Sequence, residues 1–543
     1  MGRQPLALTL AAALAAAVGL SGCSGGSSTP TPTPAPTPTP TPTPAATFQN
    51  LAHQPPVGVF LAMLLTDGTV MVQANPDTGP GSSAGDFYRL TPDATGSYAA
   101  GTWTHLAAPP TGYAPYASAE AVLADGRVLF VGGEYNQDQY TEFAPSGLTN
   151  MSAVYDPVAN HWTMIAPPPG QPYIGDVPSS ILPDGRFIFG SKLDRKMWSL
   201  DPATLTWTAV AATGKSDNFS EEGFTQLPGG TLLTVDMVNT PQSEHFVPGT
   251  NSWISDGPTP VSLTSPTTAV GGLNYGPAPL QVVGGVTYGP GPTGTYFPPG
   301  EIGPAILRPD GSVFATGSAR SGQTGHTAVY RPGATPAQPG SWTAGPNFPG
   351  IDDAGDSSAA LLPNGNVLVA GASGALYEFD GVNFRMTAAA PANATNGVRL
   401  YLLPLPSGEI LVLSPTLNVR ARLYIPLGAP LPAWAPTITT VATSLTRGQS
   451  YALTGTQLNG LSEAAAYGDE LSAATNYPLV RLTNTASGHV VYARTHDHSM
   501  GVATGATPVT THFDVPAAAD SGATSLVVIA NGIASAPVTV TIF

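Results

Sequence analysis

Apolar residues recur along this chain in one repeated pattern, in which an apolar strand, a tight polar turn and a second apolar strand follow one another. The pattern occurs seven times between Leu64 and Gly408. Such a recurrence indicates an array of equivalent units, each too small to bury a core alone. We therefore predict an all-β fold with a seven-bladed β-propeller. The turn glycines of the repeats are Gly68, Gly126, Gly185, Gly230, Gly311, Gly365 and Gly408.

Aromatic residues mark the later part of most repeats. The clearest copy is the segment 153–157, which ends in Tyr-Asp-Pro and is followed by Trp162. An exposed ring at this place could stack on a sugar, but a ring that returns in repeat after repeat is typical of packing between neighbouring blades. We assign these rings to the core. The others in the series are Trp103, Trp207, Trp253, Trp342 and Phe384.

One interval between turn glycines is much longer than the rest. It contains a segment rich in glycine and proline, Gly271–Gly300. We interpret this segment as a long surface loop. The alternative is a degenerate extra blade around residues 280–285, which would make eight blades.

A second domain follows the propeller. After Pro426 a proline-rich hinge leads into short alternating strands such as those at 451–455 and 525–530. This pattern predicts an immunoglobulin-like β-sandwich, without the cysteine pair of antibody domains. The predicted boundaries are 47–433 for the propeller and 434–543 for the sandwich.

The first residues resemble a bacterial lipoprotein signal peptide. Arg3 precedes an apolar run, and Leu20-Ser21-Gly22-Cys23 resembles a lipobox. The resemblance implies that residues 1–23 are a lipoprotein signal peptide with its lipobox, and that Cys23 becomes the lipidated first residue after cleavage; an ordinary secretory signal is the alternative. Residues 24–46 form a Thr/Pro-rich linker that favours polyproline II. We expect an extracytoplasmic, membrane-anchored lipoprotein, periplasmic or surface-facing, in the outer membrane if the cell is Gram-negative.

Composition narrows the range of partners. The chain of 543 residues has 18 Lys and Arg against 34 Asp and Glu, a formal charge of −16. Phosphate groups attract clusters of basic residues, so this balance excludes nucleic acid as a partner. Cys23 is the only cysteine, so the fold contains no disulfide and no Cys-x-x-Cys site.

Acidic residues recur just before the inner strands. Asp176, Glu221 and Asp356 each precede their turn glycine by nine positions, and Glu301 precedes its own by ten. These residues should ring one mouth of the propeller, where they could hold Ca²⁺ or accept hydrogen bonds from sugar hydroxyls. The alternative is that they only solvate loops. Nearby acidic residues in equivalent strand entries are Glu120, Glu222, Asp352 and Asp353.

The whole layout after the linker resembles a kelch-repeat propeller with a terminal sandwich, as in galactose oxidase and related proteins. Membership of the copper radical oxidases in that group would imply a Tyr-His pair in the last blade, and the equivalent positions here are Val398 and Arg399. The cysteine that crosslinks their radical tyrosine also has no counterpart. We therefore expect no copper radical chemistry, and we place Arg399 among the candidate mouth residues.

One segment with two histidines resembles a segment of these oxidases. Their sandwich domain donates a histidine that follows a threonine, and Thr495-His496-Asp497-His498 resembles that stretch. Two histidines two apart on an extended strand point to the same side, so His496 and His498 could share a transition metal. An ordinary interdomain loop is the alternative. No cofactor is assigned with certainty.

Three classes of function remain. The first is a non-catalytic propeller that binds carbohydrate or protein at its mouth. The second is a carbohydrate-active enzyme, galactose oxidase-like or otherwise metal-dependent, with its site at the same mouth. The third is a scaffold or adhesin that binds through the propeller sides and sheet edges. The sequence gives no information on oligomeric state.

Overall fold

The computed structural model describes residues 46–76, 83–136, 147–266, 272–276, 279–320, 322–389, 399–468 and 473–543. These residues are almost entirely strand and turn, with one 3-10 turn named η2 (Pro432–Trp434). Cys23, the signal peptide and nearly all of the linker lie outside the described residues, as do Val398 and Gly271. Within the described part of the chain, no helix is long and apolar enough to cross a bilayer.

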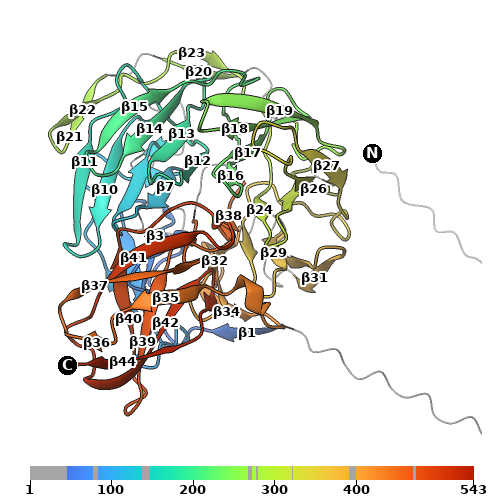
Figure 1. Cartoon of the computed structure of the whole chain (residues 1–543). Coiled ribbons are helices and arrows are strands. Elements are labelled where there is room, and N and C mark those ends of the chain that lie inside the picture. Colours follow the sequence, from blue (N-terminus) through green and yellow to red (C-terminus); the bar gives the residue numbers. More distant parts are fainter. Residues whose placement is uncertain are drawn as a thin grey trace, which may run out of the picture. The chain divides into compact units, whose positions relative to one another are not determined.

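Seven four-stranded antiparallel blades surround a central channel (Figure 1), as predicted. Blades 1 and 2 are β2 (Val59–Leu64), β3 (Val70–Ala74), β4 (Phe87–Thr91), β5 (Thr102–His105), and β7 (Ala119–Val122), β8 (Val128–Val131), β10 (Ser152–Asp156), β11 (His161–Ile165). Blades 3 and 4 are β12 (Ser179–Ile181), β13 (Phe187–Gly190), β14 (Met197–Asp201), β15 (Thr206–Val210), and β16 (Thr225–Gln226), β17 (Leu232–Val235), β18 (Gln242–Val247), β19 (Ser252–Pro258).

The remaining blades follow the same order from the channel outward. Blades 5 and 6 are β24 (Ala305–Leu307), β25 (Val313–Thr316), β26 (Thr327–Arg331), β27 (Ser341–Ala344), and β28 (Ala359–Leu361), β29 (Val367–Ala370), β30 (Leu376–Phe379), β31 (Phe384–Ala388). Blade 7 is β32 (Tyr401–Pro404), β33 (Ile410–Leu413), β34 (Ala421–Ile425) and the N-terminal β1 (Thr47–Asn50). The pairing of β1 with β34 thus joins the two ends of the ring.

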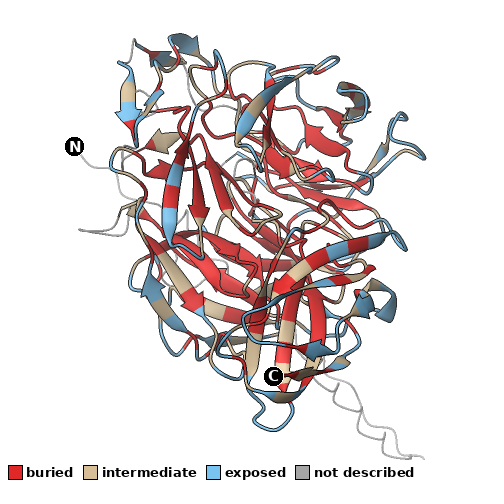
Figure 2. Cartoon of the chain, turned by 60° about the vertical axis from the view of Figure 1, so that its left-hand side comes forward, coloured by how far each residue is buried: buried red, intermediate tan, exposed pale blue. Residues whose placement is uncertain are grey.

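The turn glycines take the backbone conformation that the repeat requires. All seven have positive φ, between 75° and 88°, which glycine adopts without a steric penalty. In each turn the glycine N–H donates to the carbonyl three residues earlier, as Gly68 does to Leu65 and Gly126 to Leu123. The first two strands of each blade are mostly buried (Figure 2), so the hydrophobic pattern of the repeat reflects burial on both sheet faces.

The recurrent tryptophans connect neighbouring blades, as predicted. Trp162 of β11 in blade 2 donates its indole N–H to the Ala107 carbonyl, which follows the last strand of blade 1, at 2.7 Å. Trp207 of blade 3 donates to the Ala166 carbonyl just after blade 2 at 2.8 Å. Each ring therefore fills the gap to the preceding blade and contributes to the core rather than to a sugar-binding surface.

The described residues of the long interval between blades 4 and 5 form two short hairpins and no eighth blade. The hairpins pair β20 (Leu273–Tyr275) with β23 (Gly294–Tyr296), and β21 (Gln281–Val283) with β22 (Val286–Tyr288). They lie along the outer edge of the propeller in Figure 1. The Tyr288 hydroxyl donates to the Ile165 carbonyl of blade 2 at 2.7 Å, so this insertion reaches across blade 3. One further two-stranded sheet joins β6 (Pro115–Tyr116) to β9 (Tyr135–Asn136).

The C-terminal domain has its own hydrophobic core. Its pairing order is β35-β37-β41-β40-β39-β42-β44-β36, with β43 beside β42. Strand β40 pairs first with β39 and then with β41, so it passes from one half of the domain to the other. The immunoglobulin-like topology and the kelch type of the blades stay predictions. The strands are β35 (Thr437–Val441), β36 (Ser444–Leu445), β37 (Ser450–Thr456), β39 (Leu479–Asn484), β40 (Val490–His496), β41 (Pro508–Asp514), β42 (Gly522–Ala530), β43 (Ile533–Ala534) and β44 (Val538–Ile542).

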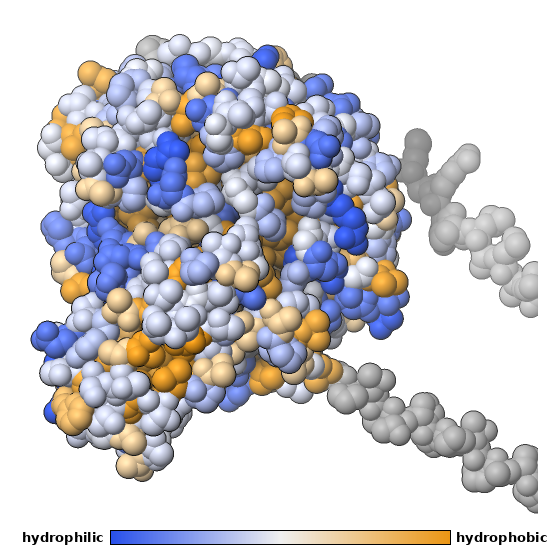
Figure 3. Space-filling model, in the orientation of Figure 1, coloured by the Kyte–Doolittle hydropathy of each residue, from blue (hydrophilic) through white to orange (hydrophobic). Residues whose placement is uncertain are grey.

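A loop from the C-terminal domain enters the propeller channel. This channel loop, residues 457–468 and 473–478 of the described chain, leaves β37 and returns into β39. Its short strand β38 (Ala465–Ala466) pairs with the inner strand β28 of blade 6. On its way in, the Glu463 carboxylate accepts hydrogen bonds from Ser180 Oγ at 2.9 Å and Gln226 N at 2.8 Å. Propeller and C-terminal domain thus belong to one compact unit, residues 45–543. Polar and apolar positions alternate over much of its surface, with an apolar patch over the C-terminal domain (Figure 3).

Candidate functional site

Residues just before the inner strands meet at one end of the channel, which we call the mouth. Five of the predicted acidic and basic residues gather there with two others that the sequence did not single out. We define the mouth cluster as Glu134, Asp176, Lys192, Glu221, Glu301, Asp356 and Arg399.

A buried lysine organises one half of the mouth cluster. The Lys192 ammonium, on the loop between β13 and β14, is fully buried and forms ion pairs with Asp176, with Glu221 at 2.8 Å and with Glu134 at 3.7 Å. Burial alone would lower the pKa of Lys192, but the three carboxylates raise it well above its ordinary value. Lys192 therefore stays charged and holds residues from blades 2, 3 and 4 together.

Asp356, Glu301 and Arg399 form the other half. The Arg399 guanidinium, with 45% of its side chain exposed, makes an ion pair with Asp356. Burial raises the pKa of Glu301 well above its usual range, and the charges of Asp356 and Glu221 raise it further. A side-chain hydrogen bond with Asp356 acts in the same direction, as expected if Glu301 keeps the proton. The two halves of the cluster meet between Glu221 and Glu301.

Two of these carboxylates sit on unusual backbone. Glu221 has φ 55° and Asp356 has φ 51°, in the left-handed region that side chains other than glycine rarely adopt. Ala117, at the same place in the repeat of blade 2, has φ 48°. Such conformations cost roughly 1–3 kcal/mol each and concentrate at functional sites. At this repeat position the backbone turns each side chain, and in blades 4 and 6 the side chain is a carboxylate of the mouth.

The channel loop contributes an aromatic side chain to the mouth. The Tyr467 ring stacks with Tyr401 of β32 at 5.8 Å between centroids and an interplanar angle of 17°. Tyr467 has the largest influence on Arg399, whose pKa it raises together with Asp356 against the effect of burial. Gly468 follows, where an added Cβ would collide with the Ile302 carbonyl of the strand entry to blade 5. The C-terminal domain therefore helps to build the mouth from inside the channel.

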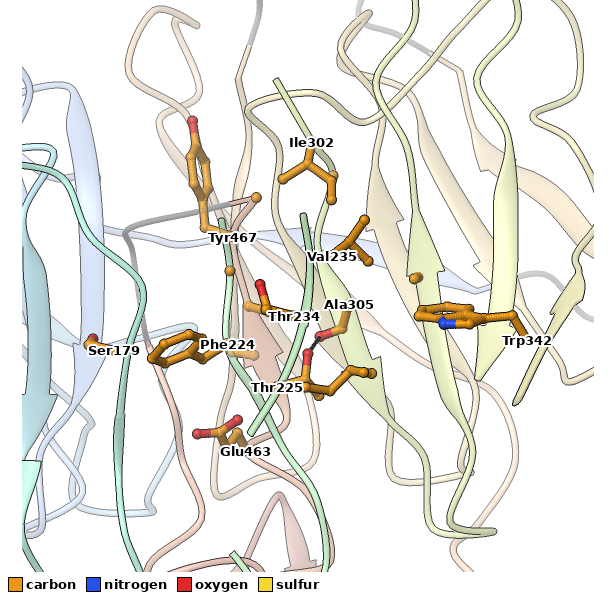
Figure 4. Close-up of a pocket in the computed structure, with 17 residues that line it drawn as sticks. Ser179, Phe224, Thr225, Thr234, Val235, Ile302, Ala305, Trp342, Glu463 and Tyr467 are labelled. Atoms are coloured by element: carbon orange, nitrogen blue, oxygen red, sulfur yellow. Dashed lines mark hydrogen bonds between the residues drawn. The ribbon is translucent and has the colours of Figure 1, made fainter. Parts of the chain in front are cut away.

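A small cavity lies inside the channel, beside the described part of this loop. A cavity of about 40 Å³ remains between the channel loop and blades 4 and 5 (Figure 4). Its lining includes Glu463 and Tyr467 from the loop and Phe224 and Val235 from blade 4. A space of this size holds one or two waters, so this cavity cannot accept a sugar or a peptide.

A groove on the mouth face is larger, with a volume of about 580 Å³. It runs between the loops of blades 4 and 5, and Phe297, Arg320 and His326 are among its lining residues. Ser265 also lines it, and its Oγ accepts a hydrogen bond from Glu301 N at 2.9 Å. The groove therefore begins beside the mouth cluster, and its volume is typical of a small-ligand site.

The other predicted mouth residues form none of the ion pairs described for the mouth cluster. Glu120 is fully buried within β7, and Asp352 accepts hydrogen bonds from Ser373 and Tyr377 inside blade 6. Asp353 turns back on its own loop and accepts a hydrogen bond from Gly355 N at 2.9 Å.

Glu222 belongs to a second buried group, the Lys215 cluster. The Lys215 ammonium contacts four carboxylates: Asp217 at 2.6 Å, Glu244 at 2.8 Å, Glu222 at 2.9 Å and Asp236 at 3.7 Å. Glu221 and Glu222 were expected together, but the left-handed backbone at Glu221, with φ 55°, turns the chain between them, and the two carboxylates join different clusters. The expectation of a single ring was wrong for Glu222, which joins the Lys215 cluster, and for Glu120 and Asp352, which are buried within their blades. Burial raises the pKa of Asp353, which stays close enough to Asp356 for that charge to help raise it further.

The predicted histidine pair does not converge. Strand β40 ends at His496, and Asp497 takes a left-handed conformation with φ 53°, which turns the next residue away. His498 is buried, its ring stacked on Tyr477 and its Nδ1 2.9 Å from Thr511 Oγ1. Burial lowers the pKa of His498 to about 3, so the ring stays neutral. A shared metal on His496 and His498 was inferred from an extended segment, and the segment is not extended at Asp497.

Sequence reasoning missed Lys192, Glu134 and Tyr467. No repeat spacing points to Lys192, because it lies between the second and third strands of its blade. One signal was present: the chain has only three lysines, and both Lys192 and Lys215 are enclosed by carboxylates. Tyr467 could not be placed, because its position depends on a loop that crosses from the other domain.

Comparisons with known proteins bear on the fold. No protein-family model matches the chain, and no curated protein matches it. Among solved structures, a fungal alcohol oxidase of the AA5 family in complex with copper is similar with a TM-score of 0.50 and 14% identity, covering 92% of this chain and 100% of that chain. YCF48 from Cyanidioschyzon merolae is similar with a TM-score of 0.40 and 11% identity, covering 70% of this chain and 98% of that chain. At the identity of the first match, the likeness shows a shared fold.

The residues at the mouth do not fit a copper centre. Copper sites draw on imidazole and thiolate ligands. The described residues include all nine histidines of the chain, and none of them belongs to the mouth cluster. Lys192 and Arg399, two permanent cations, lie there instead. The mouth cluster therefore offers no set of copper ligands among the described residues.

Proposed function

We propose that the chain is a lipid-anchored extracytoplasmic β-propeller that binds a carbohydrate at the mouth cluster, without catalysis. The observation that carries this proposal is the set of carboxylates directed into the mouth, two of them on left-handed backbone. The ion pairs with Lys192 and Arg399 account for the presence of these charges, but not for the backbone strain at Glu221 and Asp356, and such strain concentrates at ligand sites.

The charges of the mouth cluster suit hydroxyl groups. The cluster has five carboxyl groups and only two cations, so acidic groups outnumber basic ones at the mouth. Sugar hydroxyls donate to carboxylates, while Lys192 and Arg399 can donate to sugar oxygens. Ca²⁺ is a weaker candidate, because the Lys192 ammonium already takes the place between Asp176, Glu221 and Glu134 that a cation would fill.

The groove next to the mouth cluster supports a ligand longer than one sugar. Phe297, 62% exposed, offers a ring face for stacking, and Arg320 and His326 offer donors. A glycan bound with one residue at Asp356 could extend along this groove. The proposal therefore favours a chain of a few sugars over a free monosaccharide.

A glycan array followed by calorimetric titration of residues 47–543 tests the proposal. Asp356→Asn and Arg399→Gln should each weaken binding about tenfold to a hundredfold, since a hydrogen bond to a charged group contributes roughly 1.5–3 kcal/mol. Glu409→Gln, in the turn at the opposite end of blade 7, is the matched control and should leave affinity unchanged. Absence of any glycan ligand, or full affinity in Asp356→Asn, would refute the proposal.

A protein ligand is the second candidate for the same mouth. A basic side chain could enter the carboxylates in place of hydroxyl groups. Binding of that kind weakens steeply with salt, whereas binding of a neutral glycan does not. Measuring the titration at 0.05 M and 0.5 M NaCl separates the two.

Hydrolysis of a glycan is the alternative activity that the mouth could support, because Glu301 has the raised pKa of a general acid. Glycosidase carboxyl groups, however, stand about 5 Å or more apart, and Glu301 is hydrogen-bonded to Asp356. This contact supports binding over hydrolysis by that pair. New reducing ends released from a bound glycan, and lost in Glu301→Gln, would favour the enzyme.

The anchoring part of the proposal rests on Cys23 and the sequence around it. Labelling cells with a fatty acid analogue should mark the wild-type chain and leave Cys23→Ser unmarked. Fractionation should then move the variant from the membrane pellet to the soluble fraction. A labelled Cys23→Ser variant would contradict lipidation at this residue.

A further inference from the structure

A cluster of histidine and aspartate lies at the end of strand β40, away from the mouth. His496 closes β40, and His512 lies directly across from it on β41. Their rings stack, with centroids 5.6 Å apart and an interplanar angle of 18°. Asp497 follows His496 with φ 53°, which keeps its carboxylate beside both rings. We call His496, Asp497 and His512 the histidine cluster.

The donor atoms of this cluster point into one small space. Asp497 Oδ2 lies 2.8 Å from His496 Nδ1 and 3.7 Å from His512 Nδ1, and all three ligand atoms lie within 4.8 Å of one another. Ligands of tetrahedral zinc sit at about 2.0–2.2 Å from the ion, which places neighbouring donor atoms about 3.3 Å apart. Small ring rotations would bring the three atoms to that spacing. We propose that the histidine cluster binds a zinc-like divalent transition metal through His496, His512 and Asp497.

The surroundings of His496 support a metal rather than an ordinary ion pair. Its Nε2 lies 3.1 Å from Asp514 Oδ1, and Asp514 is fixed in turn by Arg494 Nη1 at 3.2 Å. Histidines that ligate metals usually donate their second N–H to a carboxylate in this way, which orients the ring and strengthens the ligand. The carboxylate behind His496 is therefore already in place.

His512 supplies the second observation. Its Nδ1 is enclosed and has no hydrogen-bond partner among the described residues. Although 45% of the His512 side chain is exposed, this nitrogen is shielded and faces the Asp497 carboxylate at 3.7 Å, beyond hydrogen-bond distance, so both atoms are available to one metal ion. A metal between His512 and Asp497 would satisfy this atom.

The donor set selects the metal class. Two imidazoles and one carboxylate suit Zn²⁺ and the neighbouring divalent metals, whereas Ca²⁺ and Mg²⁺ prefer sites made of oxygen alone. The Asp497 side chain is 61% exposed, so solvent can supply a fourth ligand. The bound ion would link β40 to β41 beside the segment that packs on blade 2 through His498 N and the Ala124 carbonyl.

Zinc titration of the full chain, freed of affinity tag and stripped with chelator, tests this site. We expect one equivalent of Zn²⁺, and at least tenfold weaker binding in His496→Gln and in His512→Gln. Asp514→Asn should weaken binding tenfold to a hundredfold, as loss of an outer carboxylate does. The Co²⁺-loaded protein should show the visible absorption of a tetrahedral ion, and this spectrum should be lost in His512→Gln.

Two control variants make the result specific. His489→Gln removes an exposed histidine of the same domain that also faces a carboxylate, Asp520 at 2.9 Å, without a second histidine; its affinity should equal that of the wild type. His498→Ala tests the metal site on His496 and His498 that the sequence predicted, and this variant should also keep the zinc affinity of the wild type. Absence of saturable zinc uptake, equal binding by His512→Gln and the wild type, or a loss in His489→Gln as large as in His512→Gln would overturn the proposal. These measurements do not involve the mouth, so their outcome is independent of whether the protein binds a glycan.

Discussion

Replacement of Lys192 by methionine should destabilise the fold in a way that depends on pH. Methionine keeps the length of the side chain and removes its charge. Glu221 and Glu134 retain 11% and 16% side-chain exposure and can regain water, but Asp176 is 2% exposed and cannot. The cost therefore arises mainly from one buried carboxylate without a counter-charge, a change that typically costs about 3–5 kcal/mol.

The magnitude has a limit, because Asp176 can take up a proton instead of staying charged. Keeping a carboxyl neutral at pH 7 against an ordinary value of about 3.9 costs about 4 kcal/mol, and at pH 5 about 1.5 kcal/mol. In the variant the folded-state pKa of Asp176 lies above the unfolded value. Its contribution to stability is then present in acid and is lost as pH rises. We expect a deficit that grows by about 1.4 kcal/mol per pH unit between pH 5 and pH 7.

Guanidinium unfolding followed by tryptophan fluorescence at pH 5, 6 and 7 measures this deficit. Lys196→Met, on the same loop, removes a lysine whose side chain is 55% exposed and should cost less than about 1 kcal/mol at every pH. Adding Asp176→Asn to Lys192→Met should restore most of the loss. A deficit that is the same at pH 5 and pH 7, or no recovery in the double variant, would refute the reasoning.

Three further predictions concern the channel loop, the blade contacts and the domain contact. Burial raises the pKa of Glu463, so the stability that its protonated form contributes is present in acid and is lost as pH rises. In urea titrations, the free energy of unfolding of Glu463→Gln should therefore increase relative to that of the wild type from pH 4 to pH 7. The same pH dependence in both proteins would contradict this. Trp162→Ala should cost about 3–5 kcal/mol, because its ring is 4% exposed and packs on three aromatic rings, while the more exposed Trp103→Ala should cost less than half as much in the same assay. Gly311→Ala should cost about 1 kcal/mol, because alanine is strained at its φ of 80°. Gly68→Ala, at φ 75°, would in addition overlap a tyrosine ring of the C-terminal domain and should lower the melting temperature further. Equal losses in the two variants would show that the ring moves aside without cost.

Local chemistry made the ring of blades predictable. The glycine of each turn needs a left-handed backbone, and the apolar residues on both sides need burial, so both features appear directly in the sequence. The same periodicity placed Asp176, Glu221, Glu301 and Asp356 at one end of the channel. It failed for Glu222, because the chain turns at Glu221, where φ is 55°, and sends the next side chain to the Lys215 cluster.

The remaining parts of the site depend on contacts between distant segments. Lys192 meets Glu134 from another blade, and Tyr467 reaches the mouth through a loop of another domain. No local sequence pattern predicts contacts between segments so far apart in the chain. The histidine pair failed for a different reason: a single residue, Asp497, leaves the extended conformation on which the spacing argument depended.

The pairing of β1 with β34 has a consequence for the order of folding. Thr47 pairs with Ile425, so the first strand of the body must wait for nearly the whole propeller to be synthesised before it finds its partner. Until then the ring is open at both ends, with unpaired strand edges that invite aggregation. Contacts between residues so far apart in sequence also form slowly. The channel loop comes later still in the chain, so ring closure and the filling of the channel should be the last steps of folding, and the mouth should take its final form only after the C-terminal domain has been made.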